Sequence, residues 1–203
     1  MIERRRLLLL ASLALAAGCA PAAAPQDPAQ PLADVPGGDA PLDKPAHVAA
    51  PVALVASAPT RRLLRAGAVG VGGELGDLGG NAQGARALLR STAPSDGDIQ
   101  YFLAAMIRVL TERYPNLERV DDLAAARAGG FRTTLVLDLR AFRPSAAADA
   151  NRADATLVVL DAAQKPLTRI AAQGMSGGVG GRLSDAIDAA AAELAQKTAK
   201  LLN

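Results

Sequence analysis

Two short stretches contain the residues that could carry out chemistry: a serine framed by glycines and a cysteine at the end of an apolar run. Ser176 lies in Gly-Met-Ser-Gly-Gly, which has the G-x-S-x-G spacing of a nucleophile elbow, where a serine attacks a carbonyl carbon. That chemistry needs a histidine base after the serine, but the only histidine, His47, lies far upstream. We therefore expect a connection of small residues here and no catalytic residue.

Cys19, the only cysteine, ends a segment with the layout of an export signal. Arginines at positions 4–6 precede an apolar run of 11 residues, 7–17, which is shorter than the roughly 20 residues of a membrane-crossing helix. The sequence LAAGC at residues 15–19 resembles the lipobox of bacterial lipoproteins, in which the cysteine is diacylated on sulfur and becomes the mature N-terminus. Ala16 stands where that family usually has leucine. The resemblance implies that residues 1–18 are a signal peptide and that Cys19 is lipidated.

An ordinary secretory signal is the alternative, and it would leave Cys19 as a thiol that could pair between molecules. Resemblance to lipoprotein sorting signals points further, because Ala20 follows the cysteine in place of an aspartate. That resemblance implies transfer to the outer membrane. We therefore expect a protein that faces the periplasm and contacts the membrane through the lipid on Cys19.

The residue counts argue against several classes of function. Of the 22 basic and 20 acidic side chains, three arginines and one glutamate leave with the signal, so 19 of each remain. A formally neutral chain with few aromatic residues lacks the basic field and the stacking platforms that nucleic acids need. One histidine and one cysteine supply no zinc ligand set. The glycine stretch at residues 67–80 lacks the G-x-x-x-x-G-K-[ST] phosphate-binding pattern, so we expect neither a metal nor a cofactor.

The chain divides by composition into a tether and a domain. Residues 19–59 are dominated by Ala, Pro, Gly and Asp, and residues 20–59 hold nine of the 13 prolines. Such a composition buries too little apolar surface to offset chain entropy. We expect a disordered tether that could reach on the order of 100 Å in polyproline II form. Residues 60–203 are then a periplasmic domain of ordinary size.

Hydrophobic periodicity predicts the elements of that domain. We expect helices at residues 96–113 and 184–202, and a short helix capped by Asp121 or Asp122 that ends at residue 128. Expected strands lie at residues 117–120, 133–142, 155–160 and 167–173, with a less regular strand at 64–71. The last three full strands should form an antiparallel meander. The predicted fold class is α/β (α+β), with a mixed sheet that contains this meander and packs against two main helices.

This order of elements resembles the periplasmic α/β domain of several envelope proteins. They are curli-secretion lipoproteins, auxiliary lipoproteins of ABC-type transporters and the amino-terminal domain of the Tol system's propeller protein. The matching residues are LERVDDL at 117–123, TLVLDL at 134–139, ATLVVLD at 155–161 and the terminal helix. The resemblance implies the fold and an envelope location. It rests on apolar alternation and names no chemical motif.

Two main functional hypotheses follow, and a hydrolase that uses Ser176 is kept only as a remote third option. In the first, the domain is a non-enzymatic accessory module that docks on an envelope protein involved in transport, secretion or assembly. Its expected contact is the sheet face that carries Asp138, Arg140 and Phe142, or an uncovered sheet edge. In the alternative, the domain carries a small apolar or lipid ligand between the sheet and the helix at residues 96–113, because such pockets have apolar linings.

Overall fold

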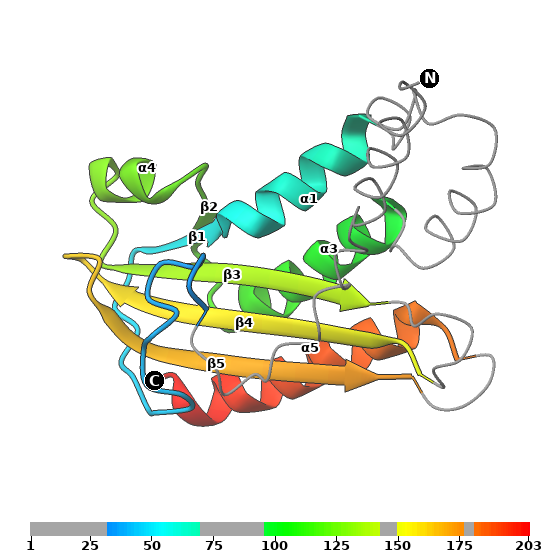
Figure 1. Cartoon of the computed structure of the whole chain (residues 1–203). Coiled ribbons are helices and arrows are strands. Elements are labelled where there is room, and N and C mark those ends of the chain that lie inside the picture. Colours follow the sequence, from blue (N-terminus) through cyan, green and yellow to red (C-terminus); the bar gives the residue numbers. More distant parts are fainter. Residues whose placement is uncertain (1–31, 70–95, 143–149, 177–180) are drawn as a thin grey trace, which may run out of the picture.

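The computed structural model describes residues 32–69, 96–142, 150–176 and 181–203. Within these ranges, a five-stranded sheet in the order β2-β1-β3-β4-β5 packs with four helices (Figure 1). The strands are β1 (Val52–Ala56), β2 (Leu117–Arg119), β3 (Thr133–Phe142), β4 (Arg152–Asp161) and β5 (Pro166–Met175). The helices are α1 (Ala58–Val69), α3 (Asp96–Arg113), α4 (Leu123–Ala128) and α5 (Leu183–Leu201). The predicted α/β class with a mixed sheet is confirmed.

The strands β3, β4 and β5 form the antiparallel meander that the sequence predicts. Leu137 of β3 lies opposite Leu157 of β4, which in turn lies opposite Ile170 of β5. All three side chains are fully buried, because residues in register point to the same face of the sheet. The turn between β4 and β5 begins at Asp161 and contains Gln164, whose φ is +62°.

The helices expected at residues 96–113 and 184–202 are confirmed as α3 and α5. The short helix α4 also begins where the aspartates predict, because the Asp122 carboxylate accepts a hydrogen bond from the Ala125 N–H at 2.8 Å. The brief strand expected at residues 117–120 is β2.

β1 is the central strand, and its position corrects the predicted domain boundary. It runs parallel to both β2 and β3 and lies between them. Its sequence is Val-Ala-Leu-Val-Ala, and its first four residues are buried, as is usual for parallel strands that are covered on both faces. The expectation that all of residues 19–59 form a tether, with the domain starting at residue 60, is therefore wrong. Five consecutive apolar residues suffice for a buried strand even within an Ala/Pro-rich segment.

A helix, α1, occupies the region where a strand was expected at residues 64–71. It begins directly after β1, and the Ser57 hydroxyl accepts a hydrogen bond from the Thr60 N–H at 3.1 Å. This is the geometry of a helix N-cap. The segment Arg61-Arg62-Leu63-Leu64-Arg65 then consists of residues with high helix propensity. The strand prediction failed because the cap lay in the part of the chain that was assigned to the tether.

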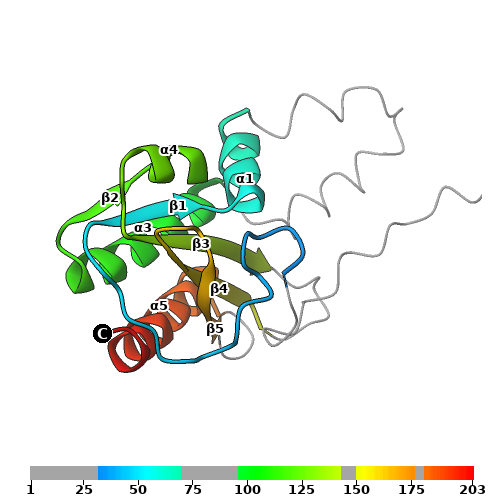
Figure 2. The same cartoon turned by 90° about the vertical axis from the view of Figure 1, so that its left-hand side faces the viewer.

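Two layers cover the sheet. On one face, α3 and α5 contribute Phe102, Leu110, Ile187 and Leu194 to the main hydrophobic core. On the other face, α4 contributes Ala126 to a smaller cluster against β1. Figure 2 shows α3 and α5 on one side of the sheet and the segment that starts at residue 32 on the other.

Residues 32–49, which we call the strap, connect this second face to the end of the chain. Leu32 and Val35 are buried against Val158 and its neighbours on the sheet. Further along, the Ala46 N–H donates to the Leu201 carbonyl oxygen at 2.8 Å. The strap is therefore part of the fold. The tether prediction now concerns only residues 19–31, which lie outside the described residues together with the signal peptide and Cys19.

The revised boundary predicts how truncated chains behave. A chain that begins at residue 60 lacks the central strand and should show no cooperative unfolding in urea, followed by circular dichroism. A chain that begins at residue 32 should unfold cooperatively. A chain that begins at residue 50 keeps β1 but loses the strap, and should be less stable by on the order of 4 kcal/mol because Leu32 and Val35 no longer cover the sheet. Cooperative unfolding of the 60–203 chain would contradict the boundary.

Candidate functional site

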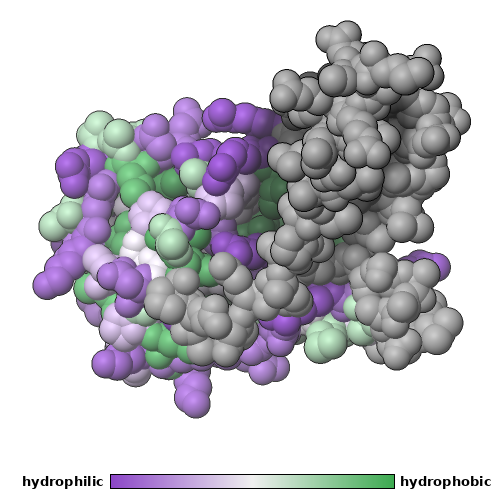
Figure 3. Space-filling model, viewed as in Figure 1, coloured by the Kyte–Doolittle hydropathy of each residue, from purple (hydrophilic) through white to green (hydrophobic). Residues whose placement is uncertain are grey.

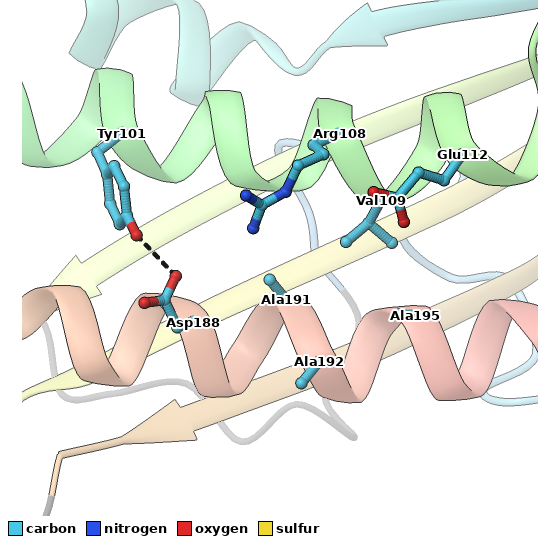
Figure 4. A pocket seen from close by; sticks show the side chains of 8 residues that line it. All are labelled: Tyr101, Arg108, Val109, Glu112, Asp188, Ala191, Ala192 and Ala195. Atoms are coloured by element: carbon cyan, nitrogen blue, oxygen red, sulfur yellow. Dashed lines mark hydrogen bonds between the residues drawn. The ribbon is translucent and has the colours of Figure 1, made fainter.

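An open groove lies on the outer side of the helical layer, between α3 and α5. Its volume is about 460 Å³, and Figure 4 shows the two helices side by side with the lining residues between them. The lining residues are Tyr101, Arg108, Val109 and Glu112 from α3 and Asp188, Ala191, Ala192 and Ala195 from α5.

The groove exists because α5 carries alanine where α3 carries longer side chains. Ala191, Ala192 and Ala195 are spaced so that the turn of the helix places them on one stripe. A side chain that ends at Cβ leaves a depression next to neighbours such as Arg108 and Glu112. The alanine content of the terminal helix thus determines the shape of this surface.

At one end of the groove, a hydrogen bond links the two helices. The Tyr101 hydroxyl donates to the Asp188 carboxylate at 2.8 Å (Figure 4). This hydrogen bond is the main cause that raises the pKa of Tyr101 above its ordinary value, and the negative charges of Asp188 and Asp185 act in the same direction. The phenol therefore stays neutral at physiological pH. Arg108, in the middle of the groove, has the opposite electrostatic effect.

The groove combines polar side chains with an apolar floor. Its eight lining residues offer a phenol, a guanidinium and two carboxylates around an apolar floor. A surface with an apolar floor and a charged rim resembles a protein interface in its composition.

Asp138, which was expected at an exposed contact, is buried. Only 2% of the residue is exposed. The Ser57 hydroxyl donates to its carboxylate, and the Arg140 Nε lies 3.0 Å from the other carboxylate oxygen. Thr60 completes the cluster, because its hydroxyl oxygen accepts a hydrogen bond from the Leu139 N–H at 2.8 Å. The expectation that Asp138 contacts a partner is therefore wrong, because the carboxylate ties the start of α1 to β3.

The other two residues of the expected contact have different positions. The Arg140 side chain is 27% exposed and pairs with the Asp138 carboxylate, whose side chain is only 1% exposed. Phe142 is the last residue of β3 and lies opposite Arg152 of β4. Its side chain is outside the described part of the structure.

Polar side chains on the sheet face around Arg140 form hydrogen bonds within β4 and between β4 and β5. Arg140 lies opposite Asp154 of β4, which lies opposite Gln173 of β5. The Asp154 carboxylate accepts hydrogen bonds from the Arg152 Nε at 2.8 Å and from the Gln173 side-chain amide at 3.1 Å. Figure 3 shows hydrophilic residues over much of the outline of this side of the molecule, with apolar residues visible between them. Because its polar groups bond to one another, this face offers fewer of them to a partner than expected.

Ser176 has a structural contact and is remote from the histidine. It is 2% exposed, and its hydroxyl oxygen accepts hydrogen bonds from the main-chain and side-chain nitrogens of Asn151, each at 3.1 Å. Ser176 is near the start of α5, whereas Ala46, next to His47, pairs with Leu202 at its end. A helix of 19 residues is about 28 Å long. The geometry thus gives Ser176 no histidine base.

The space proposed for an apolar ligand is filled by side chains. Phe102, Met106 and Leu110 of α3 point into the core and are fully buried beside Leu135 and Leu137 of the sheet. The groove described above lies on the opposite, outer side of α3. The carrier hypothesis therefore lacks, among the described residues, the pocket on which it was based.

Two further observations bear on the expectations from the sequence. Across the described ranges, His, Cys, Asp and Glu side chains do not gather in groups of three that could hold a metal ion. The helices in this part of the chain are also too short or too polar to cross a membrane. Cys19, the expected lipidation site, lies outside the described residues.

Sequence reasoning missed two parts of this arrangement. Ser57 and Thr60 were overlooked because their segment was assigned to the tether and its edge. A serine that directly follows an apolar run and precedes a proline two residues later was the available signal for a helix start. The groove left no signal, because it depends on how α3 and α5 pack side by side.

Comparisons with known proteins add little. No family model matches the chain, and no curated protein matches it. Among solved structures, a dodecamer of a PelC variant from Paraburkholderia phytofirmans has 15% sequence identity with this chain. The match covers 76% of this chain and 94% of that one, with a TM-score of 0.41. A likeness at that level carries no argument about function. The structure itself defines the class of protein, which is an α/β domain with a mixed five-stranded sheet.

The buried Asp138 cluster predicts a large effect of a small substitution. Asp138→Ala removes the buried carboxylate that accepts from the Ser57 hydroxyl and pairs with Arg140, and should lower the free energy of unfolding by roughly 2–4 kcal/mol. Urea denaturation measures this change. The control Asp188→Ala removes an exposed carboxylate and should cost less than about 1 kcal/mol. Equal effects of the two substitutions would show that the cluster is not a structural link.

Proposed function

We propose that this protein is a non-enzymatic accessory lipoprotein of the bacterial envelope. A lipid on Cys19 holds it at the outer membrane, on the periplasmic side. The α/β domain serves as a docking module for an envelope protein involved in transport, secretion or assembly.

The observation that carries this proposal is the short distance along the chain between Cys19 and the strap. Leu32, the first described residue, is already buried against the sheet. Only 12 residues, 20–31, separate it from Cys19. A chain of that length spans at most about 40 Å, far less than the reach expected for a tether that extends to residue 59. A lipid on Cys19 would therefore hold the domain close to the membrane surface.

The strap also indicates which surface would be available to a partner. The chain that leads to Cys19 leaves from the layer that contains Leu32 and Val35. The helices α3 and α5 form the opposite layer (Figure 2). The groove between them therefore faces away from the attachment of the tether, so the anchor does not block it.

The shape of the groove favours a helix of the partner as the bound element. The side chains of one helix pack into grooves between the side chains of another, and small residues allow the closer approach. The exposed side chain of Ala192 and the half-buried side chain of Ala195 provide such a floor. Asp188 and Arg108 on the rim can pair with charges of either sign on the incoming helix.

The first test concerns the anchor. Intact mass and membrane fractionation of the native protein should show a lipid-sized increase on Cys19 and recovery with the outer membrane. A Cys19→Ala variant should lose both, because one thiol is the only attachment point. A native protein that is recovered soluble with an unmodified Cys19 would reject the lipoprotein part of the proposal.

The second test concerns the groove. Ala192→Arg places a long charged side chain over the alanine floor and should abolish the protein cross-link formed in intact cells. Ala199→Arg is the matched control, because residue 199 is exposed on the same helix but is not among the residues that line the groove. The control should retain the cross-link. If both variants keep it, the docking surface lies elsewhere while the anchor result still stands.

A further inference from the structure

The outer edge of β5 is the second feature of the structure that bears on interactions with other proteins. Among the described residues, β5 ends the sheet order β2-β1-β3-β4-β5 and has a neighbouring strand on one side only. A free strand edge presents N–H and C=O groups that readily pair with another chain. The residues of β5 whose main-chain groups point to this free edge include Arg169, Ala171 and Gln173.

The strap covers the first of these positions. The Arg169 N–H donates to the Pro41 carbonyl oxygen at 2.9 Å, and the Asp43 N–H donates to the Arg169 carbonyl oxygen at 2.7 Å. The strap then leaves the edge and continues to the C-terminus, where Ala46 pairs with Leu202. It therefore supplies strand-like pairing at one residue of β5.

Two side chains of α5 cover the next two positions. The Lys197 ammonium donates to the Ala171 carbonyl oxygen at 2.6 Å. The Gln173 N–H donates to the Glu193 carboxylate at 2.7 Å. The Ala171 carbonyl oxygen is thus paired with a cationic side chain, and the Gln173 N–H is paired with an anionic one. These two side chains occupy the places that a neighbouring strand would fill.

The charged side chains at this edge also form ion pairs with one another. The Lys197 Nζ lies 3.0 Å from the Glu193 carboxylate, one helical turn away, and 3.2 Å from the Asp43 carboxylate of the strap. Burial of the ammonium acts to lower the pKa of Lys197, but hydrogen bonds to Glu193 and Asp43 outweigh it and raise the pKa above its ordinary value. Lys197 is therefore charged throughout the physiological pH range.

Gly174 explains how α5 comes close enough to reach the edge. A Cβ atom at this position would lie 1.8 Å from the Ala186 carbonyl oxygen and 2.5 Å from the Ala190 nitrogen. Only glycine allows the backbones of β5 and α5 to approach this closely. Glu193 and Lys197 follow on the next turns of α5, four residues apart and on one side of the helix.

We propose that Asp43, Glu193 and Lys197 form an edge guard that keeps β5 from pairing with β5 of a second copy of this chain. A second copy is the expected partner because each molecule carries the same edge, and two such edges related by a two-fold axis pair antiparallel. The guard side chains are between 30% and 36% exposed. Ion pairs at such positions contribute little to stability, so their removal should change association far more than folding.

The test compares the full chain with its Glu193→Ala/Lys197→Ala variant, both in a Cys19→Ala background. Light scattering over a range of concentrations should show the variant reaching twice the mass of the parent species. Amide exchange at Ala171 and Gln173 should become slower as the concentration rises. The matched control is Gln196→Ala/Lys200→Ala, which changes two exposed residues of the same helix and should behave like the parent.

A rescue separates edge pairing from misfolding. Adding Gln173→Pro to the double variant removes the exposed N–H, and proline is tolerated at a strand edge. This triple variant should return to the mass of the parent. The single variant Glu193→Ala, which keeps Lys197 in place, should associate only at higher concentration than the double variant. A folded double variant with the mass of the parent at every concentration, or association that survives Gln173→Pro, would overturn the proposal.

Discussion

The pairing of β1 with strands on both sides is the constraint on which the rest of the structure depends. Val52–Ala56 hydrogen-bonds to β2 on one side and β3 on the other, and its side chains are shared between the two layers. Such a strand needs a helical crossover on each side, because parallel neighbours cannot be joined by a tight turn. The connection to β2 contains α1 and α3, and the connection from β2 to β3 contains α4. Helices therefore cover both faces next to the central strand.

Because β1 lies at the centre, the chain that precedes it must cross the molecule to reach it. The strap does so over the sheet face that α3 and α5 leave uncovered, and there it supplies Leu32, Val35 and Ala40 to an apolar cluster to which α4 contributes only the edge residue Leu123. It then passes the β5 edge and the C-terminus. One segment thus completes the second layer, contributes to the edge and connects the domain to the chain that carries Cys19. The strap therefore joins the proposed anchor directly to the folded domain.

Polar groups in the described structure serve mainly to fix elements to one another. Asp138 links the start of α1 to β3, and Ser176 links the end of β5 to Asn151 at the start of β4. Each of these buried groups is hydrogen-bonded, which offsets part of the cost of its burial. A serine in a glycine frame and an aspartate beside an arginine suggest chemistry when read as types, but here both form hydrogen bonds that link elements of the fold. The groove between α3 and α5 keeps its polar groups at an accessible rim, which is why it remains the candidate for contact with a partner.

The sequence by itself determined the elements with strong periodicity: α3, α5 and the three strands of the meander follow from apolar spacing, and Asp122 marks the start of α4. These signals are local, so they survive without knowledge of the fold. The role of residues 32–59 was not determined locally, because the apolar run Val52–Ala56 lies within an Ala/Pro-rich segment and the apolar residues of the strap are isolated among prolines. Only the tertiary structure decided that Asp138 is buried, that Glu193 reaches the Gln173 N–H, and that alanines of α5 form a groove beside α3. Each of these outcomes depends on which elements lie next to one another, and that is a property of long-range packing which residue spacing does not encode.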